Sequence, residues 1–408
     1  MNILVLNSGS SSLKFRLIET GEAQIAANED RALARGSVEK IGEPGSLVTL
    51  RTHSGEIARL SGPIPDHQVA IETAFRCLRD ARVVVNEFDI DGVGHRVVHG
   101  GETLTESVLI DEAVVRAIEA CSELAPLHNP HNLKGYFASR QVLPHCRHVA
   151  VFDTAFHATL PVKAFLYGLP YEHYTRDRVR RYGFHGTSHR YIAQRWAQMQ
   201  AADSGPGAII SCHLGNGCSV CAVDRGRSVD TSMGFTPLAG LLMGTRSGDI
   251  DAGAVFYLMR KGDLTVGEAD RLLNEQSGLL GISGLSNDMR DLLAAERGGN
   301  ERAGLAIDMF AYRVRKYIGA YFAVLGGARA VVFTAGVGEH SPPVRARICE
   351  GLAPLGIQLN AERNQAAAGA ETRISADGSP VQVWVIPTDE ELMIARDAFH
   401  CMQTGGAV

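Results

Sequence analysis

Two arginines and a histidine stand beside glycine-rich segments of this chain. Arg96 lies shortly before a pair of glycines, Arg246 lies in a glycine-flanked loop, and His185 directly precedes another glycine. Such a set is expected around a phosphoryl group in transfer, because its equatorial oxygens carry negative charge. Asp153 and Glu390 are the carboxylates that we expect to hold Mg²⁺, directly or through water. The alternatives are a structural ion pair for Arg96 and a helix-dipole contact for Glu390.

Two turns rich in Asn, Gly and Ser repeat one pattern. Residues 7–12 and residues 216–219 each separate two apolar runs that are typical of strands. Each pattern predicts a β-hairpin whose turn leaves backbone N–H groups available to anionic oxygens. A third glycine turn, at 334–339, follows an apolar run and precedes a helix start. No Gly-Lys-Ser/Thr sequence occurs, so the turns together predict a duplicated unit and a nucleotide site without a Walker loop. Each turn alone could equally be a hairpin without a ligand.

Histidine and cysteine spacings raise the alternative of a metal site. His185 and His189 have the i, i+4 spacing of a helical zinc pair, but no Glu follows His185 and the glycine after it is unfavourable inside a helix. We expect His189 in the first turn of a helix, and His185 in the preceding loop, donating a hydrogen bond to an oxyanion. Cys218 and Cys221 have no second pair at zinc-ribbon spacing, so they are expected to be buried free thiols.

Composition limits the partners of the chain. It has 408 residues, a formal net charge of -5 and a pI near 6.3, which argues against a nucleic-acid or anionic-membrane surface. No apolar run approaches the ~20 residues that a membrane helix needs, and the apolar start is too short for a signal sequence. We therefore expect a cytoplasmic protein that binds small molecules and neither nucleic acid nor membrane.

Apolar periodicity indicates alternating strands and helices, hence the α/β class. The predicted strands are residues 3–6, 13–18, 48–50, 92–98, 148–152, 208–213, 220–223, 330–333 and 381–386. The predicted helices are residues 68–81, 112–124, 189–201, 266–276, 304–325, 342–352 and 389–401. Ser341 before a proline predicts one N-cap, and Thr388 with Glu391 predicts a capping box.

The length accommodates two hydrophobic cores. No low-complexity linker separates two halves, so the boundary is expected at a tight crossover near residues 152–153, with the last helix returning to the first half. The predicted domains are residues 1–153 plus 391–408 and residues 154–390.

Six motifs carry a family resemblance that runs from end to end. They are residues 7–14 (NSGSSSLK), 94–101 (GHRVVHGG), 152–157 (FDTAFH), 182–189 (YGFHGTSH), 243–249 (MGTRSGD) and 334–339 (TAGVGE). In these motifs the chain resembles the acetate kinase family, within the superfamily of acetate and sugar kinases, heat-shock chaperones and actin. The resemblance implies two duplicated ribonuclease-H-like domains with a nucleotide cleft between them, a homodimer, and transfer of a phosphoryl group between ATP and acetate.

The resemblance also implies roles for individual residues. The implied catalytic residues are Arg96, His128, Asp153, His185 and Arg246, with His185 and Arg246 stabilising the transition state. The implied substrate-binding residues are Arg96, Val98, Leu127, Phe184 and Pro237, the last four forming a small apolar pocket for the acetate methyl. The implied nucleotide and phosphate contacts are Ser10, Ser12, Lys14, His213, Leu214, Gly215, Asn216, Gly217, Asp288, Met289, Arg290, Gly336, Val337, Gly338 and Glu339. Asn7 and Glu390 are the implied ligands of Mg²⁺, which Mn²⁺ could replace.

Two departures from the family pattern matter for the chemistry. Met289 replaces a common aromatic residue beside the adenine, and we expect its thioether to cover a base face with an altered nucleotide preference. Cys218 and Cys221 stand where small or hydroxyl residues are common, which predicts an oxidant-sensitive enzyme.

The implied reaction needs no general base, because a carboxylate with a pKa near ~4 is already ionised at neutral pH. The barrier is repulsion between two anions, which positive charge and oriented donors lower. Two alternatives stay open. A propionate or butyrate kinase differs only by methylenes in an apolar pocket, each worth ~1–3 kcal/mol. A nucleotide-dependent switch of the same fold would not need the arginine pair.

Overall fold

The chain folds into two compact units in a computed structural model that describes residues 1–200 and 205–408. Unit 1 comprises Met1–Phe156 and Asp389–Val408, and unit 2 comprises His157–Thr388. The last residue of the helix predicted at 189–201 lies outside the described residues. None of the described helices is long and apolar enough to cross a membrane.

Unit 1 is built on an eight-stranded sheet in the order β5-β4-β3-β2-β1-β6-β8-β7. Its strands are β1 (Asn2–Ser8), β2 (Ser12–Glu19), β3 (Arg31–Glu39), β4 (Ser46–Thr52), β5 (Ile57–Gly62), β6 (Gly92–Val97), β7 (Val108–Leu109) and β8 (Arg147–Phe152). Strand β1 pairs with β2 as an antiparallel hairpin and with β6 in parallel, and β6 pairs in parallel with β8. The predicted hairpin at the N-terminus is therefore confirmed.

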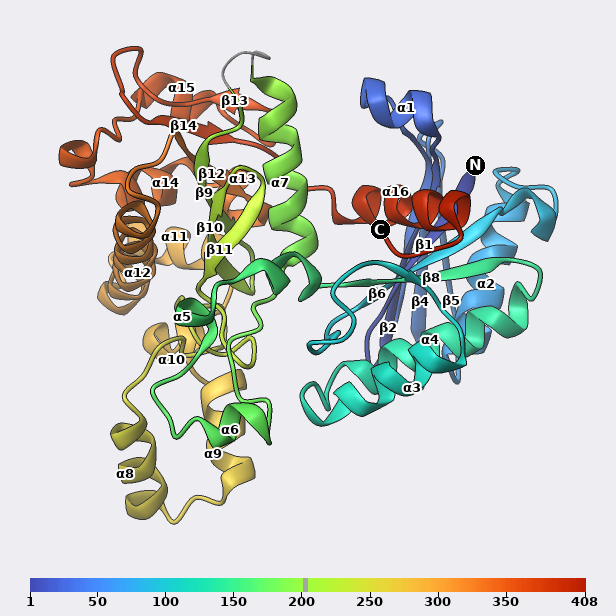
Figure 1. The fold of residues 1–408 in the computed structure, drawn as a ribbon, viewed down its shortest axis with the longest axis horizontal. Coiled ribbons are helices and arrows are strands. Elements are labelled where there is room, and N and C mark those ends of the chain that lie inside the picture. Colours follow the sequence, from blue (N-terminus) through green and yellow to red (C-terminus); the bar gives the residue numbers. More distant parts are fainter. Residues whose placement is uncertain (201–204) are drawn as a thin grey trace. The chain divides into compact units, whose positions relative to one another are not determined.

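Helices cover both faces of this sheet (Figure 1). Helices α2 (His67–Asp80), α3 (Glu112–Ala120) and α4 (Asn129–Val142) lie on one face and α16 (Glu390–Thr404) lies on the other, whereas α1 (Glu22–Ala27) buries no residue. Alternate residues of β1 point to opposite faces, so Ile3 and Val5 pack against α16, whereas Leu4 and Leu6 pack in the core beneath α2 and α4. Burial on both faces explains why the strand is an uninterrupted apolar run.

Unit 2 repeats this plan with a second sheet, which in the described residues runs β11-β10-β9-β12-β14-β13. Its strands are β9 (Ala208–Leu214), β10 (Cys218–Asp224), β11 (Arg227–Thr231), β12 (Ala330–Thr334), β13 (Thr372–Arg373) and β14 (Gln382–Val385). The antiparallel series β11-β10-β9 followed by parallel β12 and β14 matches β3-β2-β1 followed by β6 and β8. The predicted α/β class with a duplicated unit is confirmed.

Helices α7 and α12 of unit 2 both contact β9 of its sheet, whereas α8 and α9 lie away from the sheet (Figure 1). The described helices are α5 (Val162–Phe165), α6 (Glu172–Thr175), α7 (Gly186–Met199), α8 (Ala252–Gly262), α9 (Val266–Glu275), α10 (Gly278–Ser283), α11 (Met289–Arg297), α12 (Glu301–Leu325), α13 (Ala335–His340), α14 (Pro342–Cys349) and α15 (Ala361–Ala366). The long helix α12 buries Ile307, Phe310, Val314 and Ile318, which share one helical face.

Two local predictions were wrong. The third glycine turn is not a loop, because α13 begins at Ala335, whose φ of +62° makes the sharp bend out of β12. The capping box of the last helix does not form, because the side chain of Asp389, and not Thr388, accepts the hydrogen bond from the Leu392 N–H. Ser341 does occupy the N-cap of α14, before a proline, but its side chain makes no capping hydrogen bond.

A buried histidine pair lies inside unit 1. His95 on β6 and His148 on β8 are 2% and 6% exposed, and their Nε2 and Nδ1 atoms are 3.0 Å apart beside the Ser139 hydroxyl. Burial lowers the pKa of His148 to about 4, and burial together with the neighbouring His148 lowers the pKa of His95. Both rings are therefore neutral in the folded unit at pH 7.

This pair makes the stability of unit 1 sensitive to acid. A histidine with a lowered folded pKa contributes stability above its unfolded pKa of ~6.5, and this is lost as the pH falls towards 4. Between pH 7.5 and 5.0 we expect the wild type to lose about 2 kcal/mol more than His148→Gln. Urea unfolding at both pH values measures this difference. The exposed-residue control His53→Gln should behave as wild type, and an equal loss in His148→Gln would contradict the assignment.

Candidate active site

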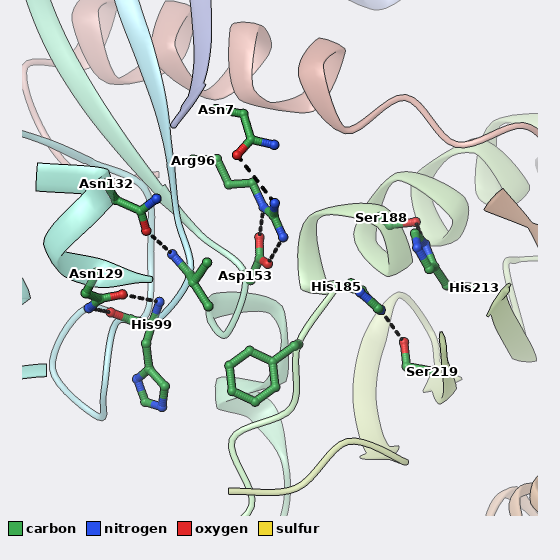
Figure 2. Close-up of polar contacts among 12 residues, drawn as sticks. Asn7, Arg96, His99, Asn129, Asn132, Asp153, His185, Ser188, His213 and Ser219 are labelled. Carbon is green, nitrogen blue, oxygen red and sulfur yellow. Dashed lines mark hydrogen bonds and ion pairs between the residues drawn. The ribbon is translucent and has the colours of Figure 1, made fainter. Parts of the chain in front are cut away.

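The parallel strands of unit 1 end in a cluster of polar side chains, which we call the Arg96 cluster: Asn7, Arg96, Asp153 and Glu390. Arg96 donates to both carboxylate oxygens of Asp153, with Nε–Oδ1 at 2.9 Å and Nη2–Oδ2 at 2.6 Å (Figure 2). Its Nη1 lies 3.5 Å from the Asn7 Oδ1. Burial lowers the pKa of Arg96, but the Asp153 carboxylate more than compensates and raises it overall. The structure thus contains the ion pair considered as an alternative for Arg96.

Glu390 begins helix α16 at the same cluster. Burial raises the pKa of its carboxyl to about 7, opposed by Arg96 and reinforced by Asp153. Arg16 holds both neighbours of Glu390, with Nη1 2.6 Å from Asp389 and 3.5 Å from Glu391. The turn that presents Glu390 is therefore fixed by charge pairing on both sides.

Two side chains of helix α4 hold the backbone of residues 98 and 99, which follow Arg96, by hydrogen bonds. Asn132 accepts from the Val98 N–H at 3.1 Å, and Asn129 accepts from the His99 N–H at 3.1 Å while donating to the His99 carbonyl at 2.9 Å (Figure 2). These two asparagines were not singled out from the sequence. Their signal was the repeated His-Asn pattern at 128–132, which drew attention only to its histidines. His128 itself precedes α4 and is half-buried.

The phosphate-binding residues predicted in unit 1 surround the β1–β2 turn. Ser10 is exposed in the turn, Ser12 begins β2, and Lys14 is an exposed residue of the same strand. The Gly9 N–H bonds to the Ser12 carbonyl at 2.8 Å, which closes the turn. Their contact with a nucleotide stays a prediction.

In unit 2 the predicted residues His185, Arg246 and Asn216 lie at or near the β9–β10 turn. A side chain at Gly217 would bring Cβ to 3.5 Å from both His185 Nε2 and Arg246 Nη1, so both nitrogens lie close to this glycine. Asn216 holds the surrounding loops, because its carbonyl accepts from the Gly244 N–H at 2.9 Å and its side chain accepts from Asn287 at 3.2 Å. The turn, the arginine loop and the segment before α11 are thereby joined.

Arg246 differs electrostatically from Arg96. Its Nη1 donates to the Pro237 carbonyl at 3.2 Å, and no carboxylate of the described residues forms an ion pair with it. Burial lowers the pKa of Arg246. A partly buried guanidinium without an acidic partner is a favourable site for an anion.

His185 is placed by a strained backbone. It precedes α7 with a φ of +56°, an uncommon conformation for a residue with a side chain. Its Nδ1 lies 2.9 Å from the Ser219 hydroxyl, and its ring stacks on His213 with centroids 4.2 Å apart (Figure 2). His189 lies one helical turn further on and is fully buried.

The residues predicted to hold the adenosine have unequal exposure. Asp288 caps α11 and binds the exposed Arg290 side chain, with Nη2–Oδ2 at 2.6 Å. Met289 is only 4% exposed, which argues against the expectation that its thioether covers a base. Gly336 is exposed in α13, whereas the Glu339 carboxylate accepts from the Ala335 N–H at 2.7 Å and so serves its own helix.

The thiols of unit 2 are protected from reaction. Cys218 and Cys221 are fully buried, and burial raises the pKa of each to about 12. The thiolate is the form that oxidants attack, so the structure argues against the predicted oxidant sensitivity at these positions.

The Arg96 cluster is suited to Mg²⁺ but not to a densely coordinated metal. No three His, Cys, Asp or Glu side chains of the described chain are arranged to hold an ion. Mg²⁺ commonly takes only one or two carboxylates and keeps its waters and substrate phosphates. The carboxylate of Glu390 and the amide oxygen of Asn7 fit this role, whereas both oxygens of Asp153 are bound by Arg96.

Sequence and structure comparisons agree on the family. The acetokinase family model matches residues 2–396. The chain is 51% identical over 413 residues to an acetate kinase from Chloroherpeton thalassium, with 98% of this chain and 99% of the relative covered. The chain belongs to the acetokinase family. It is also 50% identical over 406 residues to an acetate kinase from Halothermothrix orenii, with 99% of this chain and 100% of the relative covered.

Solved structures of this family share the whole fold. A crystal structure of Porphyromonas gingivalis acetate kinase has a TM-score of 0.92 at 44% identity, covering 98% of this chain and 99% of that one. A propionate kinase from Francisella tularensis has a TM-score of 0.88 at 39% identity, covering 97% and 98%. The resemblance seen in the motifs is confirmed, and the chain is an enzyme of the phosphotransferase class that uses ATP.

Adding one methyl group at Gly217 tests whether the reacting group lies next to this residue. Gly217→Ala places its Cβ in ordinary van der Waals contact with His185 and Arg246, so the fold should tolerate it. The methyl nevertheless occupies the space that both nitrogens face, and we expect kcat to fall roughly a hundredfold, as when an oxyanion donor is lost. Steady-state kinetics and thermal unfolding measure the two effects. Unchanged kcat at an unchanged melting temperature would contradict the placement of the site.

Proposed function

We propose that this enzyme catalyses the reversible, Mg²⁺-dependent transfer of the ATP γ-phosphate to acetate, giving acetyl phosphate and ADP by direct in-line transfer. The observation that carries the proposal is that Arg246 Nη1 and His185 Nε2 both approach Gly217, each 3.5 Å from the position of a Cβ at that residue. Their placement suits the equatorial oxygens of a phosphoryl group in transfer.

The residues of unit 2 act on the phosphates. Arg246 lacks an acidic partner in the described chain, so its charge is available to the group being transferred. His185 donates a hydrogen bond to the same group. Asn216 and the N–H groups of the glycine turn hold the phosphates that stay with ADP, and Asp288 and Gly336 line the adenosine.

The residues of unit 1 act on acetate and on the metal. Arg96 offers Nη1 to the acetate carboxylate while Asp153 holds the rest of its guanidinium in place. Glu390 and Asn7 would hold Mg²⁺, with Asp153 contributing through water, and Mn²⁺ could replace it. The bound metal would neutralise phosphate charge. Since acetate is already ionised, no residue is needed as a general base.

We expect acetate to be preferred over larger acids, with Val98 and Pro237 as the apolar contacts that favour it. Val98 and Phe184 are buried, Pro237 is half-buried, and Leu127 is exposed. The likeness to a propionate kinase at 39% identity keeps propionate as a second substrate. One methylene alters binding by only ~1–3 kcal/mol, so discrimination is expected to be moderate.

Acyl phosphate formation, trapped as the hydroxamate, tests the reaction directly. With Mg-ATP we expect kcat/KM to be highest for acetate and roughly tenfold or more lower for propionate, with butyrate lower again. Arg246→Ala serves as the control, because it should still bind ATP and form little product. ATP binding without product from any of the three acids would refute the proposal, and a preference for butyrate would favour the alternative acceptor.

We also propose that the enzyme is a cytoplasmic homodimer. ATP as substrate and eight free, buried cysteines support a reducing compartment. Helix α8 has no buried residue, and it exposes Phe256 by 58%, Tyr257 by 54% and Leu258 by 39%. Val266 at the start of α9 is 77% exposed. A second copy of the chain that covers this apolar helix would form a twofold interface.

A charge placed on α8 tests the dimer. Phe256→Arg should shift the wild-type dimer, which has twice the 43.8 kDa chain mass, towards monomer, because a charge cannot be buried without a partner. Light scattering after gel filtration gives the mass. Val85→Arg, which changes a 78% exposed residue of unit 1, is the matched control and should stay dimeric. A monomeric wild type at micromolar concentration would contradict the proposal.

A further inference from the structure

Four side chains of unit 2 form one continuous hydrogen-bonded series, which we call the His185 relay. His185 Nδ1 lies 2.9 Å from Ser219 Oγ, which lies 2.8 Å from His189 Nε2. His189 Nδ1 in turn lies 2.9 Å from Ser211 Oγ. Ser211, Ser219 and His189 are all 0% exposed, so water does not reach the inner members of the relay. Figure 2 shows its outer end at His185 and Ser219.

The number of protons in the relay restricts how it can be arranged. Burial lowers the pKa of His189 well below its usual value, so this ring is neutral and carries one N–H. Each serine hydroxyl also has one proton. If His185 Nδ1 accepts from Ser219, then His189 must donate to Ser219 through Nε2. If instead His185 donates through Nδ1, then Ser219 donates to His189 Nε2.

The inner serine favours the first arrangement. Within the described residues, the Ser211 hydroxyl forms one hydrogen bond, which is to His189 Nδ1. When His189 carries its proton on Nε2, its Nδ1 is an acceptor and the Ser211 O–H is satisfied. In the opposite arrangement the Ser211 proton lacks that acceptor, and a buried unsatisfied donor costs about 1–3 kcal/mol. Ser211 therefore favours the arrangement in which each member of the relay donates its hydrogen bond in the direction of His185.

We propose that Ser219 and His189 are positioning residues that hold His185 in the tautomer with a proton on Nε2 and none on Nδ1. This inference rests on the proposed phosphoryl transfer. Nε2 is the nitrogen that faces Gly217 beside Arg246. In this tautomer His185 donates an N–H to a phosphoryl oxygen, whereas the other neutral tautomer presents a lone pair to an anion. The ring is held in orientation as well, because it stacks on His213 at an interplanar angle of 24°.

The relay explains why two polar residues, Ser211 and His189, are buried although neither contacts the reacting groups. Ser211 and His189 lie in the buried layer between β9 and α7, where apolar side chains would ordinarily pack. Polar groups in such a layer are tolerated when each donor is satisfied, and a satisfied series specifies one arrangement.

Nitrogen NMR of the full-length enzyme labelled with ¹⁵N-histidine tests the tautomer without turnover. His185→Gln identifies the His185 resonances by their loss. We expect wild-type His185 to show a protonated Nε2 and an unprotonated Nδ1 at pH 7.5. A wild-type His185 protonated on Nδ1, or on both nitrogens, would overturn the inference.

Variants of the relay connect the tautomer to catalysis. Ser219→Ala should mix the two tautomers and lower kcat roughly ten- to a hundredfold, with KM for ATP changed less than about twofold. Ser219→Thr retains the hydroxyl and should restore both readouts. His189→Gln keeps an N–H donor towards Ser219 and should retain the Nε2–H tautomer.

Ser228→Ala is the matched control, because it removes another fully buried hydroxyl that bonds a histidine, His157 Nδ1, at 2.8 Å. It should leave the His185 resonances and kcat unchanged. An unaltered tautomer and kcat in folded Ser219→Ala would overturn the positioning role. If wild type forms no acyl phosphate while His185 shows the expected tautomer, the proposed reaction fails and the tautomer assignment stands.

Discussion

The parallel pairing of the first strand in each unit determines which edge of the sheet carries the strand-end side chains of the candidate site. Leu6 of β1 pairs with His95 of β6, and Val97 of β6 pairs with Phe152 of β8. The residues that follow, including Asn7 and Asp153, therefore reach the same edge of the sheet. Carboxyl ends of parallel strands are the usual position of ligands in α/β proteins, since loops there escape the sheet's own hydrogen bonds. In unit 2 the pairing of β9 with β12 aligns His213 with Thr334 in the same way.

Arg96 and Arg246 differ in whether a carboxylate compensates the charge of the guanidinium. Arg96 is neutralised by Asp153 before any ligand arrives, so its guanidinium is rigid and only weakly attractive to an anion. Among the residues that the structure describes, Arg246 is held by carbonyl and sulfur contacts and forms no ion pair, so its charge is not compensated there. A rigid guanidinium suits the orientation of a small carboxylate, and an uncompensated one suits the larger charge of a phosphoryl group. The division is consistent with the two roles proposed.

Sequence patterns predicted the elements whose signals are local. Apolar runs broken by Asn, Gly and Ser predicted both hairpins, and helical periodicity placed α2, α9, α12 and α16 to within a few residues. Helix α4 was not predicted, although its Pro130 lies in the first turn, where proline is well tolerated. Residues of β3 were missed because its charged, partly exposed sequence lacks a clear alternation.

Most side-chain hydrogen bonds of the site could not be predicted from the sequence. The asparagine contacts to residues 98 and 99 join positions about thirty residues apart, and the His185 relay joins α7 to β9 and β10. Such contacts depend on strand register, which no local pattern contains. The eight buried thiols give that packing an experimental use. Because Cys77 and Cys146 lie in the core of unit 1 and Cys212 and Cys349 in unit 2, the rate at which a thiol reagent modifies each one measures how often its own unit opens.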